Sequence, residues 1–264
     1  MNSFSPIGIF DSGVGGTSIW MEIHQLLPNE NTIYLADSKN APYGYKSVDE
    51  VIALSIKNTD VLLHLGCKII VVACNTATTQ AISELRSKYD VPVIGIEPAI
   101  KPAALQTQTK NIGILATKGT LSSSLFYKTS ELISKDISVI EVVGEGLVPL
   151  IEEGKLDSPE MMDLLLKYTK PMIDANVDRI VLGCSHYPHI IAQLQKLLPS
   201  HVKIIDSGIA VAKQTKLVLE RNHLLNTHFS DRPSLKFYSN KKTDTLKLLL
   251  LDYIDQISIE LKDF

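Results

Sequence analysis

Cysteine is scarce in this chain, and the sequence lacks the features of a secreted or membrane-spanning protein. Only three cysteines occur among 264 residues, an odd number that argues against a framework of paired disulfides. The chain does not start with a basic segment and a long apolar core, and even the leucine-rich stretch at 246–252 contains Lys247 and Asp252. We therefore expect no secretory signal, no membrane span, a cytoplasmic location and free thiols in a reducing compartment.

An excess of charge of either sign is also missing. The formal net charge is −3, and lysine and arginine form no continuous stripe along the sequence. This balance argues against nucleic acid as the main partner, because binding to a phosphate backbone requires a concentrated basic surface. Hydrophobic residues make up 45% and charged residues 21% of the chain, which is typical of a globular protein and excludes a disordered one.

The length allows one large or two modest domains, and an internal repeat favours two. Two cysteines that follow apolar runs, Cys74 and Cys184, are separated by 110 positions. The other matching segments have similar offsets: residues 7–12 match 112–117 at 105, residues 32–35 match 138–141 at 106, and residues 92–96 match 203–207 at 111. A duplicated domain with small insertions produces matches that keep their order while the offset grows.

The alternation of elements predicts the fold class. Short β-branched runs alternate with longer helical patterns, which indicates βαβ units and largely parallel sheets. We expect an α/β protein with two similar doubly wound domains, related by a pseudo-twofold axis, and an active site in the cleft between them. The end of the chain predicts a strand at 235–238 and a helix from 243 to about 257 that can pack on the first half. The predicted domains are therefore 1–95 together with 208–264, and 96–207.

Helix-start signals place both cysteines next to helices. A capping-box pattern at Ser47 predicts a helix that ends near Gly66. A strand over 68–73 then leads to Cys74, and Asn75 or Thr76 can cap the next helix. The second half shows the same order, with a helix starting at Pro159, a strand over 179–182 that leads to Cys184, and a helix starting at Pro188.

Cys74 and Cys184 are the leading candidates for chemistry. Ligands of open α/β sheets bind outside the carboxyl ends of the strands, where both cysteines are expected. A nearby helix amino terminus or a cation can lower the pKa of a thiol. Two such thiols on opposite walls of one cleft could exchange protons with both faces of one carbon. The alternative is that each is a small buried hydrophobic residue, which is our interpretation of Cys67.

A glycine-rich turn, DSGVGG at residues 11–16, follows the first predicted strand. Its backbone amides could hold an anion. A dinucleotide site is the competing interpretation, with Asp37 as the ribose-binding acid, but Ser18 occupies the third glycine position. Asp11 would repel a pyrophosphate, and it is better suited to act as a general base near Cys74 or to orient a substrate ammonium.

Further polar residues gather near the predicted cleft. His186 could act beside Cys184 as Asp11 does in the first half, because imidazole titrates near neutrality, although it could also be an N-cap histidine without a catalytic role. Glu152 either faces the cleft or ends a solvated helix, and His189 is expected on a helix surface. The turn at 42–44 offers amides and a phenol that could grip a carboxylate.

Together these residues resemble glutamate racemase, a member of the cofactor-independent aspartate/glutamate racemase superfamily. The similarity runs in order through nearly the whole chain. Its motifs are IFDSGVGG at 9–16, ADSKNAPYG at 36–44, ACNTAT at 73–78, LGCSHYP at 182–188 and FYSN at 237–240.

The resemblance implies racemisation of glutamate without pyridoxal phosphate, which supplies D-glutamate for peptidoglycan in the bacterial cytoplasm, commonly by a homodimer. It implies that Cys74 removes the α proton of the D isomer and Cys184 that of the L isomer, with Asp11 and His186 assisting; no metal is expected. The implied substrate-binding residues are Asp11, Ser12, Pro42, Tyr43, Gly44, Asn75, Thr76, Thr117, Ser185 and His186, with Glu152 as an accessory residue. The family usually has threonine where this chain has Ser185, so the hydroxyl is retained and a methyl group is lost.

Three alternatives stay open. The substrate could be aspartate or another acidic amino acid, because two thiols do not measure the length of a side chain. The two halves could instead clamp an amino acid as a sensor, or the protein could act on a partner, as some glutamate racemases do with DNA gyrase. Zinc could also bind to Cys74, Cys184, His186 and Asp11, although these lack the short spacing of structural zinc sites.

Overall fold

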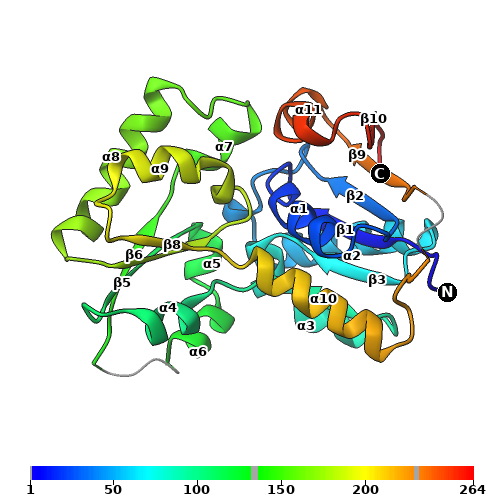
Figure 1. Cartoon of the computed structure of the whole chain (residues 1–264), viewed down its shortest axis with the longest axis horizontal. Helices are drawn as coiled ribbons and strands as arrows, with labels where there is room; N and C mark the ends of the chain where they lie inside the picture. Colours follow the sequence, from blue (N-terminus) through cyan, green and yellow to red (C-terminus); the bar gives the residue numbers. More distant parts are fainter. Residues whose placement is uncertain (1, 132–135, 229–231) are drawn as a thin grey trace.

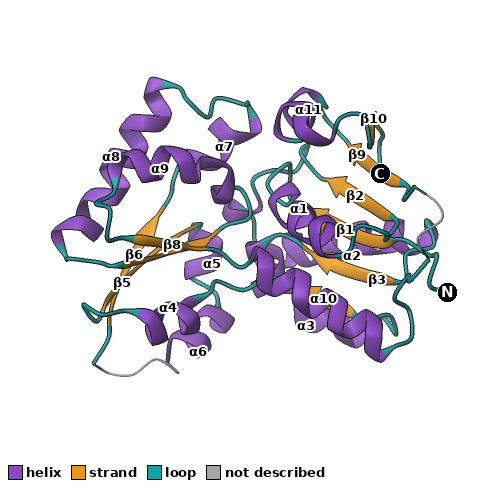
Figure 2. Ribbon diagram, in the orientation of Figure 1, coloured by secondary structure: helices purple, strands orange, loops and turns teal. Residues whose placement is uncertain are grey.

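The computed structural model describes residues 2–131, 136–228 and 232–264, and the strands in this part of the chain form two parallel sheets (Figures 1 and 2). The six-stranded sheet has the order β10-β9-β2-β1-β3-β4, and the four-stranded sheet has the order β6-β5-β7-β8. We call the parts of the molecule built on them the first lobe and the second lobe. The strands of the first lobe are β1 (Ile7–Asp11), β2 (Thr32–Ala36), β3 (Ile69–Val72), β4 (Val93–Gly95), β9 (Leu235–Ser239) and β10 (Ser258–Leu261). Those of the second lobe are β5 (Asn111–Ala116), β6 (Ser138–Val143), β7 (Arg179–Gly183) and β8 (Lys203–Ile205).

Helices cover both faces of each sheet. In the first lobe α1 (Thr17–Leu26) packs with α10 (Gly208–Arg221), and α2 (Val48–His64) packs with α3 (Asn75–Lys88). Alternate residues of β3 serve the two faces, because Ile69 and Val71 join one hydrophobic cluster while Ile70 and Val72 join another. The second lobe has α4 (Ile100–Gln106) with α6 (Ser124–Glu131), and α8 (Pro159–Asp174) with α9 (Ile191–Leu197). No helix in the described part of the chain is both long and apolar enough to cross a membrane.

The strand order confirms the internal repeat. The order β2-β1-β3-β4 of the first lobe reappears as β6-β5-β7-β8 in the second. Ile7 pairs with Ile69, and its counterpart Ile112 pairs with Arg179, so the equivalent positions of β3 and β7 are 110 residues apart. This is the offset between the two cysteines.

One predicted offset was wrong by a single residue. Ile7 pairs with Thr32 and Ile112 pairs with Val139, so β2 corresponds to β6 at an offset of 107 and not 106. Strands of a parallel sheet can be buried on both faces, and their nearly continuous apolar runs do not mark the register.

The local helix signals were mostly confirmed. The capping box at Ser47 is formed, Gly66 ends the α2 turn at a φ of +83°, and Ser158 caps α8 with Pro159 at its first position. The helix expected at Pro188 begins as a short 3₁₀ helix, η2 (Tyr187–Ile190), before α9. The predicted cap of α3 was wrong, because Cys74 is the N-cap and its sulfur accepts a hydrogen bond from the amide of Ala77.

The end of the chain returns to the first lobe, as predicted, but by a different route. Strand β9 pairs with β2, and the predicted helix to residue 257 is replaced by α11 (Asp244–Leu249), the 3₁₀ helix η3 (Leu251–Tyr253) and the strand β10. Pairing of β10 along β9 satisfies the backbone of an otherwise open edge, which a helix could not do. Figure 1 shows both chain termini in the first lobe.

A buried ion pair fastens the outer end of the first lobe. The ammonium of Lys68, just ahead of β3, is fully buried and contacts the carboxylate of Glu30. It also donates hydrogen bonds to the carbonyl oxygens of Ser3 at 2.6 Å and Leu224 at 2.8 Å. Since Leu224 follows α10, this one cation joins segments from the first third of the chain to one from its last fifth.

Candidate active site

Cys74 and Cys184 lie at the carboxyl ends of equivalent strands and line one cavity between the lobes. Cys74 precedes α3, and Cys184 directly follows β7. Both are buried, with exposed fractions of 4% and 6%. The cavity is small, and its walls are Ser12, Pro42, Tyr43, Gly44, Cys74, Asn75, Thr76, Thr117, Val148, Cys184, Ser185 and His186. The first seven come from the first lobe and the other five from the second.

Most of the residues selected from the sequence meet at this cavity. Nine of the ten predicted substrate-binding residues line it, and Asp11 lies immediately behind, held by a hydrogen bond from the hydroxyl of Ser185 at 3.1 Å. The sequence interpretation missed Val148, because an apolar residue within an apolar helix carries no functional signal. The roles of these residues toward a substrate stay predictions.

The glycine-rich turn does not offer its amides to an external anion. Asp11 accepts hydrogen bonds from the backbone amides of Gly13 and Gly16, at 3.2 and 3.0 Å. The amide of Val14 donates to Glu152 at 2.6 Å. The carboxylates of the protein itself therefore occupy the place that a phosphate would take, and the dinucleotide interpretation was wrong.

Behind Cys184 stands a chain of polar groups that ends in Glu152. Nδ1 of His186 lies 3.8 Å from the sulfur of Cys184, and its Nε2 lies 2.7 Å from the carboxylate of Glu152. Glu152 also accepts a hydrogen bond from Ser38 at 2.9 Å. His186 occupies the N-cap position of η2, but its side chain does not cap the helix. Glu152 thus faces the site and is not a solvated helix end.

Burial and neighbouring charges shift the pKa values of His186 and Glu152 in opposite directions. Burial lowers the pKa of His186, but contacts with Cys184 and Glu152 and the charge of Asp11 outweigh it, so the pKa lies well above its usual range. Burial likewise raises the pKa of Glu152, but His186, the amide of Val14 and the hydroxyl of Ser38 overcome it and lower the pKa. The contact between His186 and Glu152 therefore favours a protonated imidazole beside an ionised carboxylate.

Cys74 has the opposite environment. Burial and the nearby charge of Asp11 raise the pKa of its thiol, although the amide of Ala77 acts against them. The helix amino terminus was expected to lower this pKa, and that expectation was wrong. Desolvation destabilises the thiolate more than a hydrogen bond from one backbone amide stabilises it. The pKa of Asp11 is also raised, by burial first, with His186 acting in the other direction.

Asn75, Thr76 and Thr117 contribute polar groups to the cavity wall. Among the described residues, neither the amide nitrogen nor the amide oxygen of the buried Asn75 side chain has a hydrogen-bond partner. Buried amides are rarely left unpaired, so this one is available to pair with a polar group in the cavity. The hydroxyl of Thr117 lies 3.0 Å from each of the hydroxyls of Thr76 and Thr120, which links the lobes beside the cavity.

Asp37 fixes the turn that carries Tyr43 and Gly44. It accepts hydrogen bonds from the phenol of Tyr43 at 2.6 Å and from the side chain of Asn40 at 2.8 Å. These contacts hold the 3₁₀ helix η1 (Tyr43–Tyr45) at the cavity wall. Burial, followed by the charge of Asp37, raises the pKa of Tyr43, so this phenol stays neutral. Asp37 is thus a structural residue and not a ribose ligand.

His189 was expected on a helix surface, and that expectation was wrong. Its Nε2 lies 3.0 Å from the hydroxyl of Thr17 and 3.3 Å from the carbonyl oxygen of Gly15. Burial and the charge of His186 lower the pKa of His189 to about 4. It therefore joins η2 of the second lobe to the start of α1 as a neutral imidazole.

The described residues contain no group of three or more His, Cys, Asp and Glu side chains placed to hold a metal ion. The three cysteines are free thiols. What the site offers is two cysteine side chains, a buried imidazole whose protonated form is stabilised, and an unpaired side-chain amide around one small cavity. This set can move protons and bind a polar ligand.

Similar proteins share both the sequence and the fold. Residues 15–215 match the family model described as Asp/Glu/Hydantoin racemase. A glutamate racemase from Pseudomonas syringae pv. tomato is 45% identical over 84% of this chain and 81% of that protein. The Escherichia coli glutamate racemase, solved with L-glutamate and the activator UDP-MurNAc-Ala, has a TM-score of 0.83 and 32% identity over 97% of this chain and 98% of that one. The Francisella tularensis glutamate racemase, solved with D-glutamate, also has a TM-score of 0.83, with 28% identity over 99% of this chain and 98% of that one. This chain is a member of the Asp/Glu/Hydantoin racemase family.

Proposed function

We propose that this amino-acid racemase interconverts L-glutamate and D-glutamate, with Cys74 and Cys184 as its two bases. The observation that carries the proposal is that two buried thiols from equivalent strands line one small cavity. Related enzymes of known structure bind L-glutamate and D-glutamate. In this reaction one sulfur removes the α proton from one face of the substrate, and the other sulfur delivers a proton to the opposite face.

The two sides of the cavity suit different parts of this exchange. In the L-to-D direction Cys184 acts as the base, so its own proton must leave first. His186 is within 3.8 Å of that sulfur and can hold the proton, while Glu152 stabilises the imidazolium. Cys74, whose pKa is raised, keeps its proton and can deliver it to the carbanion. The reverse reaction exchanges the two roles.

The remaining residues bind and orient the amino acid. The unpaired amide of Asn75 offers both a donor and an acceptor to the substrate. Developing negative charge at the α carbon and carboxylate requires fixed donors in a site that excludes water. We propose that Ser12, Gly44, Thr76, Thr117 and Ser185 provide them, with Pro42 and Tyr43 shaping the wall and Asp11 holding Ser185 or the substrate ammonium.

The cellular setting follows from the same proposal. We propose that the enzyme acts in the cytoplasm as a homodimer and supplies D-glutamate for peptidoglycan. The domain boundaries proposed from the sequence, 1–95 with 208–264 and 96–207, follow the same duplication. Ser185 keeps the hydroxyl of the threonine usual in the family, and it uses that hydroxyl to donate to Asp11.

The test is proton exchange in D2O without added cofactor. The purified protein should replace the α proton of either glutamate enantiomer with deuterium and invert its configuration, while aspartate should react more slowly. Cys74→Ser and Cys184→Ser should each abolish inversion, and Cys67→Ser serves as the control because Cys67 is buried away from the cavity. Tight glutamate binding without any exchange would favour a sensor and contradict the proposal.

A further inference from the structure

The cavity of the two thiols has a solvent-facing edge formed by three residues. Nine of its twelve lining residues are buried, and only Pro42, Gly44 and Thr117 are half-buried. All three also line a neighbouring pocket. This edge therefore connects the cavity of the thiols to the neighbouring pocket.

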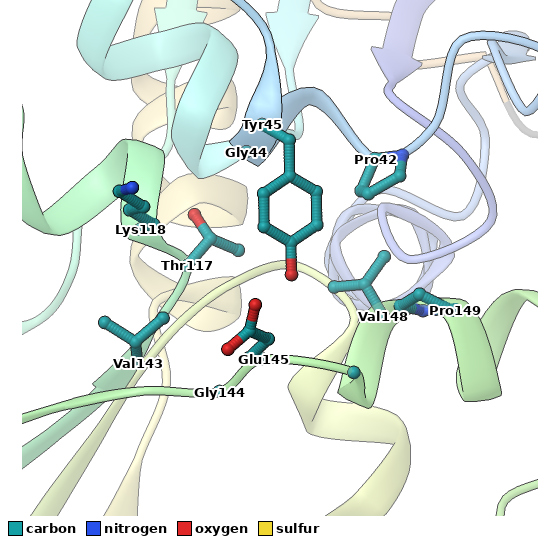
Figure 3. Close-up of a pocket in the computed structure, with 11 residues that line it drawn as sticks. Pro42, Gly44, Tyr45, Thr117, Lys118, Val143, Gly144, Glu145, Val148 and Pro149 are labelled. Atoms are coloured by element: carbon teal, nitrogen blue, oxygen red, sulfur yellow. The ribbon is translucent and has the colours of Figure 1, made fainter.

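A tyrosine stands in the middle of this second pocket (Figure 3). Tyr45 projects between the side chains of Thr117, Lys118 and Val143 on one side and those of Pro42, Val148 and Pro149 on the other, and its hydroxyl points toward Glu145. Tyr45 belongs to η1 of the first lobe, whereas Glu145 belongs to the second. We propose that this pocket is the vestibule of the active site and that Tyr45 controls access to it, an inference that rests on the proposed function.

The parts on either side of Tyr45 are fixed. The neighbouring Tyr43 is anchored by Asp37, as described above. Across the vestibule, the carbonyl oxygen of Glu145 accepts a hydrogen bond from the phenol of Tyr168 at 2.7 Å. Burial and the charge of Glu145 raise the pKa of Tyr45, while the amide of Gly146 acts against them. The phenol thus extends from the first lobe to groups of the second, and its side chain is the part that can swing, since 58% of the residue is exposed.

The two lobes lie close together beneath Tyr45. A Cβ atom on Gly44 would lie 3.2 Å from Cβ of Thr117, and one on Gly119 would lie 3.2 Å from the backbone of Gly44. The two lobes are therefore in direct contact at the inner end of the vestibule. The proposed route to the thiols runs along this seam, and Tyr45 lies on its outer side.

The rim of the vestibule suits an acidic amino acid. Lys118 and Glu145 line it from the second lobe, and neither forms a salt bridge within the described residues. A cation and an anion on one rim match a ligand that carries both carboxylates and an ammonium. The charge of Lys118 attracts the net negative charge of glutamate, and the charge of Glu145 faces the ammonium.

Alkylation of the buried thiols tests the vestibule without relying on racemisation. Full-length protein is treated with iodoacetamide, and labelling of the peptides containing Cys67, Cys74 and Cys184 is followed by mass spectrometry. Tyr45→Ala should accelerate labelling of Cys74 and Cys184 by about tenfold, the effect of losing one hydrogen bond with its packing. Tyr45→Phe should give a smaller increase, because the ring remains. Tyr127→Ala, a change at a similarly exposed tyrosine on α6, should have no effect.

The outcomes separate this inference from the proposed function. Unchanged labelling of Cys74 and Cys184 in Tyr45→Ala overturns the vestibule, even if the enzyme racemises glutamate normally. Accelerated labelling in a protein that fails to racemise supports the vestibule and rejects the proposed function. Labelling of Cys67 reports a general opening of the protein. If Tyr45→Ala accelerates labelling of Cys67 as much as that of Cys74 and Cys184, the Tyr45→Phe variant decides. In Tyr45→Phe, faster labelling of Cys74 and Cys184 with an unchanged rate for Cys67 supports the role of the hydroxyl. If neither variant labels Cys74 and Cys184 faster than Cys67, that role is refuted.

Discussion

Replacing Glu152 with glutamine tests the polar chain behind Cys184. The amide keeps the size of the side chain, and its oxygen can still accept the hydrogen bond from Val14 while its NH2 group can donate to the hydroxyl of Ser38, but it removes the charge that faces His186 at 2.7 Å. His186 then loses a main cause of its raised pKa and holds a proton less firmly. We expect Glu152→Gln to slow the step in which Cys184 exchanges a proton with L-glutamate.

The size of the effect follows from the contact that is lost. A hydrogen bond to a charged group contributes about 1.5–3 kcal/mol, which corresponds to a roughly 10- to 150-fold lower kcat/KM. The free energies of the two enantiomers are equal, so kcat/KM must fall by the same factor in both directions. A selective effect on one of the two thiols is therefore not visible in kcat/KM. It must be measured on an individual proton-transfer step.

Isotope effects provide that measurement. If the step at Cys184 becomes slower, the primary isotope effect with α-deuterated L-glutamate should rise, and that with α-deuterated D-glutamate should fall toward one. Glu153→Gln is the matched control, because Glu153 is exposed and pairs with Lys155. An unchanged kcat/KM, or isotope effects that move together for both enantiomers, would refute the assignment of Glu152 to the Cys184 side.

Three further predictions concern the lining of the site, the seam between the lobes and the buried cation. Ser185→Thr should lower the KM for glutamate by up to about fourfold in steady-state assays, because burial of one added methyl group contributes about 0.8 kcal/mol to binding. A higher KM would contradict this. Between about pH 6.5 and 4 the unfolded chain binds a proton at His189 that the folded protein excludes, so the stabilisation present above pH 6.5 is lost as the pH falls. Urea denaturation at pH 7.5 and pH 5 should show a larger loss for the wild type than for His189→Asn, and parallel losses would argue against it. Lys68→Ala should reduce the free energy of unfolding by about 3–5 kcal/mol, because it leaves the buried carboxylate of Glu30 unpaired; a loss below about 1 kcal/mol in the same assay would count against a buried pair.

Much of the site could be predicted because chemistry and position coincided in the sequence. Cys74 and Cys184 follow equivalent apolar runs, and the carboxyl ends of parallel strands meet at one edge of each sheet. Glu152 could not be assigned in this way, since a glutamate at the end of a short helix looks the same whether it faces solvent or an imidazole 34 positions away. Its partner is decided by packing between elements, which the spacing of residues along the chain does not encode.

The fold was predictable where local patterns determine the backbone and less so where pairing does. The capping box at Ser47 and the turn at Gly66 depend on neighbouring residues only, and both form. The short strand β10 depends on an open edge of β9, and the leucine-rich stretch before it favoured a longer helix. Likewise the raised pKa of Cys74 depends on how completely the lobes bury it, which outweighed the helix start beside it.

The order of strands along the chain has a consequence for synthesis on the ribosome. All four strands of the second lobe lie between residues 111 and 205, so that sheet can be completed while the polypeptide is still growing. The sheet of the first lobe cannot, because β9 and β10 emerge last and cover the edge of β2. A nascent chain that stalled before residue 235 would therefore display an open β-edge, a feature that invites aggregation and recruits chaperones.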